Sequence, residues 1–320
     1  MSKLKVAVIG AGPKGREHAQ VLSGFPDVVL TAVCDPQIQN RESLANELKI
    51  PHAYACMEEM LSEHEITAVF LATPPHLNAS VARSFLERGV HTMIEKPAGM
   101  TAAETMDLRD TAATTGRKAM IALNRRFNPI IVRAWEMVKA RGPVVQLVGE
   151  FHKGLKAIEK RGKYGPDVLD NFLMSNDIHA IDVVRFMAGS EPLEVHSYGR
   201  RVASDFRNMH AALVRFENDV VANLAFNYTT DSRLERYEIH GMGISAYLEG
   251  VDRGVVYCDG DRLDLNPENC GGAGGTEQEN RFFVYCVKND RDIVLPAANL
   301  DEALKSARLV ERIRDGLIDT

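Results

Sequence analysis

The sequence predicts an α/β protein: an amino-terminal doubly wound parallel sheet, then a carboxyl-terminal α+β domain with a large, mainly antiparallel open sheet. Three observations predict this fold class. The first strand runs into a glycine-rich turn, apolar runs alternate with helical segments up to residue 124, and later strand patterns follow one another across short polar turns. Alternation favours parallel strands with crossover helices, whereas consecutive strands favour an antiparallel sheet.

The first predicted strand ends in a glycine turn, Gly10-Ala11-Gly12-Pro13-Lys14-Gly15. The first glycine permits a tight turn, the second lets backbone N–H groups approach a pyrophosphate, and the third lets helix and strand pack closely. The second strand, 28–34, is followed by Asp35, which stands 20 residues after Gly15, where a ribose-binding carboxylate is expected. Because Pro36-Gln37 offers no adjacent arginine for a 2′-phosphate, the pattern predicts NAD rather than NADP. The predicted cofactor-binding residues here are Gly10, Ala11, Gly12, Pro13, Lys14, Gly15 and Asp35.

Three further strands complete the predicted parallel sheet. Expected strands span 66–72, 90–94 and 118–123, and expected helices span 41–48, 57–63, 78–88 and 101–114. Thr73-Pro74-Pro75-His76 follows the first of these strands and Glu95-Lys96-Pro97 the next. Ligands of open α/β sheets bind at the carboxyl ends of the strands. We therefore expect cofactor contacts from Thr73, Pro74, Pro75, His76, Glu95 and Lys96.

In the second half of the chain, strand patterns follow one another with few helices between them, which is typical of an antiparallel α+β domain. Expected strands span 144–151, 194–201, 209–217, 220–228, 236–241, 244–250 and 254–258. Helices are expected at 129–140, 178–187 and 300–317, and a glycine-rich stretch at 271–275 is the low-complexity segment. Several strands are joined by turns as short as Glu217-Asn218-Asp219.

Length and composition set limits on the class of protein. A chain of 320 residues favours two domains, and a net charge of −6 gives no electrostatic reason to expect nucleic acid or an anionic membrane as partner. The five cysteines lack C-x-x-C spacing, so we expect reduced thiols and no metal site. The first strand starts by residue 5, which leaves no room for a charged leader and apolar segment, so we expect a cytoplasmic protein.

These motifs in this order resemble the Gfo/Idh/MocA family, the nicotinamide-dependent oxidoreductases related to glucose-fructose oxidoreductase and inositol dehydrogenase. The carriers are Gly10 to Gly15, Cys34-Asp35, Ala72 to His76, Glu95-Lys96-Pro97, Asn124 to Pro129 and Asp177 to Asp182. The resemblance implies a Rossmann dinucleotide-binding domain over 1–124 and a substrate-binding and oligomerisation domain over 125–320. It implies hydride transfer at a hydroxyl or carbonyl carbon of a sugar or polyol, and a homodimer or homotetramer formed through the carboxyl-terminal sheet.

Two residues are predicted to carry the chemistry. Oxidation of an alcohol needs a base for the hydroxyl proton and a cation beside the developing alkoxide. Lys96, at a strand end, is the predicted electrostatic stabiliser, and His179, at a predicted helix start behind Ser175, Asn176 and Asp177, is the predicted acid/base. Many family members carry an aspartate at the position of Ser175. Further candidates for orienting the substrate are Asp177, Asp182 and Arg125.

The function expected from the sequence is an NAD(P)-dependent oxidoreductase acting on CH–OH groups of a sugar, polyol or related compound. Two alternatives stay open: an NAD-dependent glycosidase that acts by transient oxidation, and a noncatalytic dinucleotide-binding sensor or regulator. The basic segment from His152 to Tyr164 is expected to be a solvated loop, and an acidic substrate becomes attractive if it lines the cleft.

Overall fold

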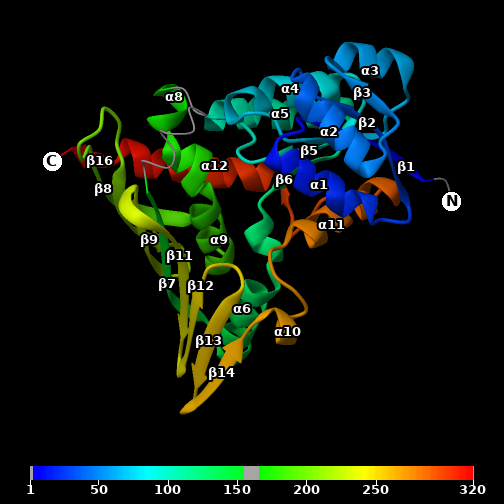
Figure 1. Cartoon of the computed structure of the whole chain (residues 1–320). Coiled ribbons are helices and arrows are strands. Elements are labelled where there is room, and N and C mark those ends of the chain that lie inside the picture. The colour runs from blue at the N-terminus through cyan, green and yellow to red at the C-terminus, as the bar shows by residue number, and fades with distance from the viewer. Residues whose placement is uncertain (1–2, 155–165, 320) are drawn as a thin grey trace. The chain divides into compact units, whose positions relative to one another are not determined.

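The computed structural model of this chain describes residues 3–154 and 166–319 (Figure 1). The backbone divides into two compact units, Met1–Ala122 with Thr276–Leu304, and Leu123–Gly275 with Lys305–Thr320. The polypeptide therefore returns to the first unit late in the sequence, and the compact units do not follow the linear division at residue 124. The assignment of cofactor binding to 1–124 and of substrate binding and oligomerisation to 125–320 stays a prediction.

The first unit is built on a parallel sheet in the order β15-β6-β5-β4-β1-β2-β3. Only β15 runs antiparallel to its neighbour within this described sheet. Val6, Ala7 and Val8 of the central strand β1 have no exposed surface, as expected for a sheet covered on both faces. The strands are β1 (Leu4–Ile9), β2 (Val28–Cys34), β3 (His52–Tyr54), β4 (Ala68–Leu71), β5 (His91–Glu95), β6 (Ala119–Ala122) and β15 (Ala298–Asn299). The doubly wound sheet is confirmed, and the short strands β3 and β15 were not predicted.

Helices cover both faces of this sheet. In Figure 1, α1 and α11 lie together on one side of the strands, and α4 and α5 on the other. The bounds are α1 (Pro13–Ser23), α2 (Ile38–Leu48), α3 (Met57–Glu63), η1 (Pro75–Leu77), α4 (Asn78–Glu87), α5 (Ala102–Thr115) and α11 (Thr276–Lys288). Helix α11 was not predicted. It belongs to this unit because Phe283, fully buried, packs edge-on against Phe70 of β4, with the ring centroids 5.5 Å apart.

The second unit is built on an open sheet in the order β14-β13-β12-β11-β7-β10-β9-β8-β16. Most neighbours are antiparallel, and the parallel pairs are β7 with β10 and β8 with β16. The strands are β7 (Val144–Gly154), β8 (Pro192–Arg200), β9 (Met209–Phe216), β10 (Val221–Asn227), β11 (Thr229–Gly241), β12 (Ile244–Glu249), β13 (Arg253–Cys258), β14 (Asp261–Leu265) and β16 (Leu317–Asp319). This confirms the predicted mainly antiparallel sheet.

One face of the open sheet is covered by helices. The helical segments are η2 (Asn124–Phe127), α6 (Pro129–Arg141), α8 (Pro166–Leu169), η3 (Leu173–Asp177), α9 (Ile178–Ala188) and α10 (Pro267–Cys270), and α12 (Leu300–Asp315) continues into this unit from the first. Helix α9 crosses β7 closely because Gly149 has no side chain: a Cβ there would lie 2.9 Å from Leu224 and 3.1 Å from Val184.

Several details differ from the expected elements. The last helix ends at Asp315 rather than at 317, and β16 follows it; β14 was also not predicted. Both strands lie at the edges of the sheet, and the first four residues of β14 are all exposed, so this strand shows no alternation of buried and exposed residues. Within the described ranges, no helix combines the length and the apolar character needed to cross a membrane.

Candidate functional site

The glycine turn of the first unit has the geometry that its sequence predicts. Gly10 has a φ of +89°, and a Cβ there would lie 2.4 Å from the Ala72 carbonyl oxygen. A Cβ on Gly15 would lie 1.7 Å from the Gly10 carbonyl oxygen, so this glycine lets α1 pack on the turn. Gly12 differs, since a Cβ there would meet no atom within 4 Å. The two outer glycines are therefore packed against other backbone atoms. The middle one, Gly12, has open space beside its backbone and directly precedes the first residue of α1.

Asp35 ties the second strand to this turn. Its Oδ2 accepts a hydrogen bond from the Ala11 backbone N–H at 2.8 Å, and its Oδ1 accepts one from the Gln37 N–H at 2.8 Å. The residue is 7% exposed. Each carboxylate oxygen keeps a further lone pair, so a ribose hydroxyl can still donate to it.

Arg41 is a neighbour of Asp35 that the sequence reasoning missed. Its Nη1 donates to the carbonyl oxygens of Asp35 and Pro36, both at 3.2 Å. An arginine is therefore close in space to the carboxylate that is predicted to bind the ribose, although none is adjacent in sequence. The available signal was the expected helix over 41–48, because Arg41 is its first residue and follows Asp35 by only six positions.

Asn78 fixes the segment that carries Lys96. It is fully buried, and its Nδ2 donates to the carbonyl oxygens of Glu95 and Pro97, both at 2.8 Å. Thr73 Oγ1 donates to Asn78 Oδ1 at 2.7 Å, so one amide joins the ends of β4 and β5. Lys96 itself is half-buried at this junction, beside the buried Pro97. No motif or spacing predicted this role for Asn78.

Glu95 supplies a buried negative charge at the same strand end. Its Oε1 lies 3.3 Å from His18 Nε2. Burial alone would raise the pKa of Glu95, but the hydrogen bond from His18 and the charges of His18, Lys14 and Lys96 hold that pKa below its usual value. The charges of two other predicted residues, Lys14 and Lys96, therefore both act on the Glu95 carboxylate. Of the other predicted contacts, Pro75 and His76 lie in η1, which directly follows Thr73 and Pro74.

In the second unit, His179 is the second residue of α9 and is 8% exposed. The chain enters this helix through the π-helical turn η3. Asp177 does not cap the helix through its side chain; instead its Oδ1 accepts hydrogen bonds from the Tyr228 hydroxyl and, at 3.1 Å, from Asn176 Nδ2. Tyr228 is fully buried and stacks on Phe172, with the ring centroids 4.7 Å apart. The role of Tyr228, and the contact of Asn176 with Asp177, were not predicted from the sequence.

Arg125 and Asp182, both predicted to orient substrate, lie in separate buried ion pairs. Arg125 binds Glu235 through two hydrogen bonds of 2.7 and 2.8 Å. Asp182 has no exposed surface and is bound by Arg126 through bonds of 2.9 and 2.7 Å, with a third from Ser306 at 2.6 Å. These pairs give both residues a structural role in the second unit, and their contact with substrate stays a prediction.

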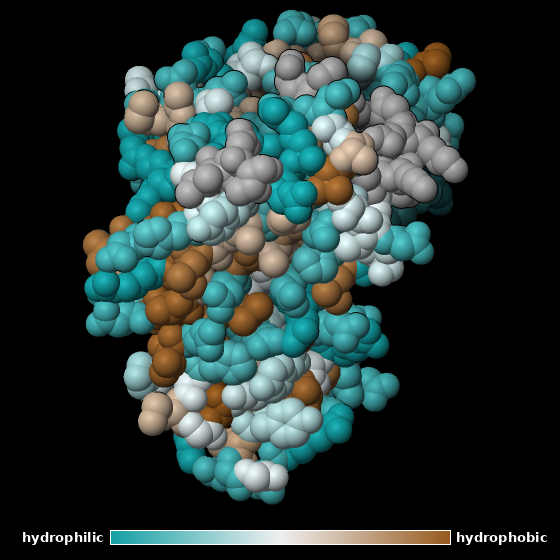
Figure 2. Space-filling view, turned by 90° about the vertical axis from the view of Figure 1, so that its left-hand side faces the viewer, coloured by the Kyte–Doolittle hydropathy of each residue, from teal (hydrophilic) through white to brown (hydrophobic). Residues whose placement is uncertain are grey.

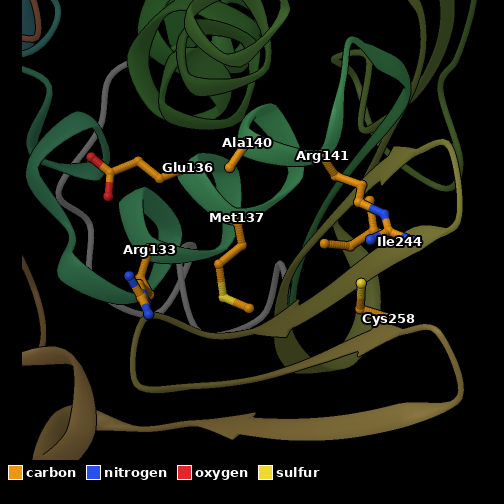
Figure 3. A pocket seen from close by; sticks show the side chains of 7 residues that line it. All are labelled: Arg133, Glu136, Met137, Ala140, Arg141, Ile244 and Cys258. Carbon is orange, nitrogen blue, oxygen red and sulfur yellow. The ribbon is translucent and has the colours of Figure 1, made fainter.

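A surface pocket of about 460 Å³ lies elsewhere in the second unit (Figure 3). It is lined by Arg133, Glu136, Met137, Ala140, Arg141, Ile244 and Cys258, from α6, β12 and β13. None of the predicted site residues lines it, and Arg141 is paired with Asp259. Over residues 3–154 and 166–319, no group of three or more His, Cys, Asp or Glu side chains is arranged to hold a metal ion. Most of the basic segment from His152 to Tyr164 lies outside the described residues.

Comparison with known families agrees with this geometry. Residues 4–123 match the oxidoreductase family with an NAD-binding Rossmann fold, GFO_IDH_MocA, and residues 134–246 match the GFO/IDH/MocA carboxyl-terminal domain. The chain belongs to the Gfo/Idh/MocA family. The predicted family, fold class and NAD cofactor are thereby confirmed, as is the assignment to NAD(P)-dependent oxidoreductases.

Relatives within the Gfo/Idh/MocA family include sugar and polyol dehydrogenases. The UDP-N-acetylglucosamine 3-dehydrogenase of Acidithiobacillus ferrooxidans is 30% identical over 230 residues, which cover 70% of this chain and 67% of the relative. The scyllo-inositol 2-dehydrogenase (NAD(+)) of Bacillus subtilis is 23% identical over 280 residues, covering 83% and 80%. The solved structure of the Acidithiobacillus enzyme covers 99% of this chain and 98% of its own, with a TM-score of 0.82 and 23% identity.

Proposed function

We propose that this chain is an NAD-dependent dehydrogenase that transfers a hydride between the nicotinamide and a hydroxyl-bearing carbon of a sugar, polyol or related compound. The observation that carries the proposal is the glycine turn. Its backbone is tightly packed at Gly10 and Gly15, but it has open space at Gly12, at the amino terminus of α1. A helix amino terminus with an open backbone favours phosphate oxygens. The named activities of the sugar and polyol dehydrogenases in this family support the substrate class.

The residues of the turn and Asp35 would hold the dinucleotide. When bound, the nicotinamide supplies a hydride acceptor or donor. The Lys96 ammonium is proposed to stabilise the oxygen of the substrate as it gains negative charge, and its own charge helps to keep the pKa of the neighbouring Glu95 below the usual value. His179 is proposed to take or return the hydroxyl proton, since an imidazole exchanges protons near neutral pH.

We propose NAD rather than NADP as the preferred cofactor, because the Asp35 carboxylate repels a 2′-phosphate. Arg41 is the residue that works against this preference, since its guanidinium lies beside Asp35. Parallel titrations with NADH and NADPH, followed by nicotinamide fluorescence and calorimetry, test the proposal. Tighter NADH binding is expected, and Asp35→Ser should reduce the difference; equal affinities in the wild-type protein would contradict it.

Turnover tests the catalytic roles. With myo-inositol, D-xylose and UDP-N-acetylglucosamine as trial substrates, NADH formation is measured at 340 nm. Lys96→Met and His179→Ala are each expected to reduce the hydride-transfer rate at least about 100-fold while NADH binding persists. Lys5→Met, an exposed lysine of β1 paired with Glu65, is the matched control. An unchanged rate in Lys96→Met overturns the role of that residue, and cleavage of nitrophenyl glycosides without net NADH formation would favour the glycosidase.

We further propose that the protein is cytoplasmic and that the uncovered face of the open sheet joins a second copy of this chain, as a homodimer or homotetramer. Leu213, Tyr198 and Tyr247 are 45%, 53% and 36% exposed on this face. Figure 2, which views the side where β8 and β9 lie in Figure 1, shows hydrophobic residues gathered among polar ones. Exposed apolar groups of this kind favour an interface. Light scattering coupled to size exclusion should show an oligomer, and Leu213→Arg should reduce it; a wild-type monomer at micromolar concentration contradicts the proposal.

A further inference from the structure

Two cationic side chains of the second unit lie near one buried aromatic ring. Phe151 of β7 is 1% exposed. Lys153 Nζ lies 5.0 Å from the centre of its ring, and Arg233 Cζ of β11 lies 5.6 Å from the same centre. Two cations near one ring benefit from its π-electrons but repel each other. An arrangement of this kind needs a negative partner.

Glu235 cannot be that partner for both cations. Its Oε1 accepts hydrogen bonds from Arg125 Nε at 2.7 Å and from the Tyr237 hydroxyl at 3.0 Å. Its Oε2 accepts from Arg125 Nη2 and from Arg233 Nη2, both at 2.8 Å. A carboxylate has about four acceptor positions, and all four are filled here. One carboxylate shared by two guanidinium groups leaves one positive charge uncompensated.

Lys153 donates to a neutral acceptor, the amide oxygen of Asn176. Within the described part of the chain no carboxylate lies at ion-pair distance from its ammonium, and the nearby Asp177 accepts from Tyr228 and Asn176 instead. An ammonium offers three N–H donors and a guanidinium five. The bonds above use one donor of Lys153 and one of Arg233, whose side chain is 58% exposed. Both cations therefore have donors left for a ligand.

We propose that Lys153 and Arg233 form an anion clamp, which selects a substrate carrying a carboxylate or phosphate group in addition to its reacting hydroxyl. The clamp lies in the same unit as His179, and its contact residue Asn176 comes three residues before that histidine. The inference rests on the proposed dehydrogenase function and narrows its substrate to acidic sugars, sugar phosphates or related hydroxy acids. Lys153 and Arg233 are specificity-determining residues and take no part in proton or hydride transfer.

The ionisation of Lys153 agrees with this assignment. Burial, and next the charge of Arg233, lower the pKa of Lys153 to about 8, against the attraction of Asp177 and Glu235; Arg125 adds to the lowering. A bound anion favours the ammonium and raises this pKa. The affinity for an anion should therefore be full at pH 7 and fall as the pH rises above about 8, when the free protein loses the lysine charge.

Matched ligands test the clamp. Calorimetry on the NADH-loaded protein at pH 7 compares D-glucuronate with D-glucose, D-galacturonate with D-galactose, and glucose 6-phosphate with glucose. We expect at least one anionic ligand to bind about tenfold more tightly than its neutral partner. Lys153→Met and Arg233→Gln should each remove most of that difference and leave the neutral affinities within about twofold. Arg262→Gln is the control, since Arg262 is similarly exposed, at 61%, and lies on the edge strand β14.

A pH series distinguishes recognition from a structural role. Between pH 7 and 9 the wild-type preference for the anionic ligand should decline, whereas Lys153→Arg should keep it, because a guanidinium stays charged. The comparisons with the two uronates and with glucose 6-phosphate show whether the clamp binds a carboxylate or a phosphate group. A preference that is absent in the wild type, or that survives both neutralising variants, overturns the clamp while leaving the dehydrogenase intact, provided that a neutral sugar binds and is oxidised.

The opposite failure is also recognisable. If NADH binds but no sugar of either class does, the proposed function fails, and inorganic phosphate titrated into the NADH-loaded protein still tests the clamp. Phosphate binding that is lost in Lys153→Met supports it, and phosphate binding that is absent, or unchanged by the substitution, contradicts it.

Discussion

The two units hold their candidate site residues by different kinds of bond. In the first unit, side chains bind the backbone: Asp35 accepts from two backbone N–H groups, and Asn78 donates to two backbone carbonyl oxygens. In the second unit, charged side chains bind one another, as in the bidentate pairs of Arg125 with Glu235 and of Arg126 with Asp182. A backbone partner is present whatever the sequence, whereas a side-chain partner can be lost by one substitution.

This difference predicts how the units respond to substitution. Removal of one charge from a buried pair leaves the other charge desolvated and uncompensated, while removal of both can be neutral. Removal of a side chain that binds the backbone leaves carbonyl or N–H groups that no second substitution can delete. We therefore expect compensating double variants at the paired charges of the second unit, and none at Asp35 or Asn78 of the first.

The largest expected effect is at Arg126. Arg126→Met should lower the free energy of unfolding by about 3–5 kcal/mol, because Asp182 then remains buried with an uncompensated charge. The double variant Arg126→Met/Asp182→Leu should recover most of that loss. Urea unfolding measures both, with Lys5→Met as an exposed-pair control expected to cost less than about 1 kcal/mol. A double variant as unstable as the single one would show that the second unit does not depend on charge pairing.

Asn78 gives the matching experiment for the first unit. Asn78→Ala should cost about 3 kcal/mol, since two buried carbonyl oxygens and the Thr73 hydroxyl lose their partner. It should also reduce hydride transfer at temperatures where the protein is still folded, because the segment with Lys96 is no longer held. Asn40→Ala serves as the control and should be nearly neutral, because the side chain of this half-buried asparagine of α2 donates to Gln37 in a hydrogen bond that is exposed to solvent. Equal losses in the two variants would contradict the role of Asn78.

The same contrast explains what the sequence could predict. The glycine turn, Asp35 and the strand that ends at Glu95 are local features, so spacing along the chain identifies them. The partners of Arg125 and Arg126 lie 110 and 56 residues away, and no periodicity links a charged residue to so distant a partner. Helix α11 was missed for a related reason: what places it in the first unit is the contact of Phe283 with Phe70, far apart in sequence. Strand β3, with three residues, is too short to show a pattern.

Acid should destabilise both units through one histidine in each, the half-buried His91 in the first and the buried His210 in the second. Burial, with nearby cations, lowers the pKa of His91 to about 4, and it does the same for His210. Both are neutral when folded and titrate near 6.5 when unfolded, so the stability they give is full above pH 6.5 and is lost as the pH falls toward 4. Each should cost about 1 kcal/mol between pH 7 and 5.5.

The free energy of unfolding, measured across this pH range, should therefore decrease less steeply with falling pH in His91→Gln and in His210→Gln than in the wild type. His91 makes the sharper test, because its Nδ1 accepts the Lys118 backbone N–H at 2.9 Å and must be unprotonated to do so. A slope unchanged in both variants would assign the acid sensitivity to other groups.

The smallest expected effect is at a helix cap, and it tests whether every side-chain hydrogen bond to the backbone in the first unit contributes equally to the free energy of unfolding. Thr101 caps α5 by accepting the Glu104 N–H at 3.1 Å, at a half-exposed position. Water can replace a lost cap there, so Thr101→Ala should cost only about 0.5–1 kcal/mol, and Thr101→Ser, which keeps the hydroxyl, should be close to wild type. Thermal and urea unfolding of the pair measure the difference. If Thr101→Ala cost as much as Asn78→Ala, burial would not be what distinguishes these bonds, and the stability of the first unit would depend on the bond to the backbone itself.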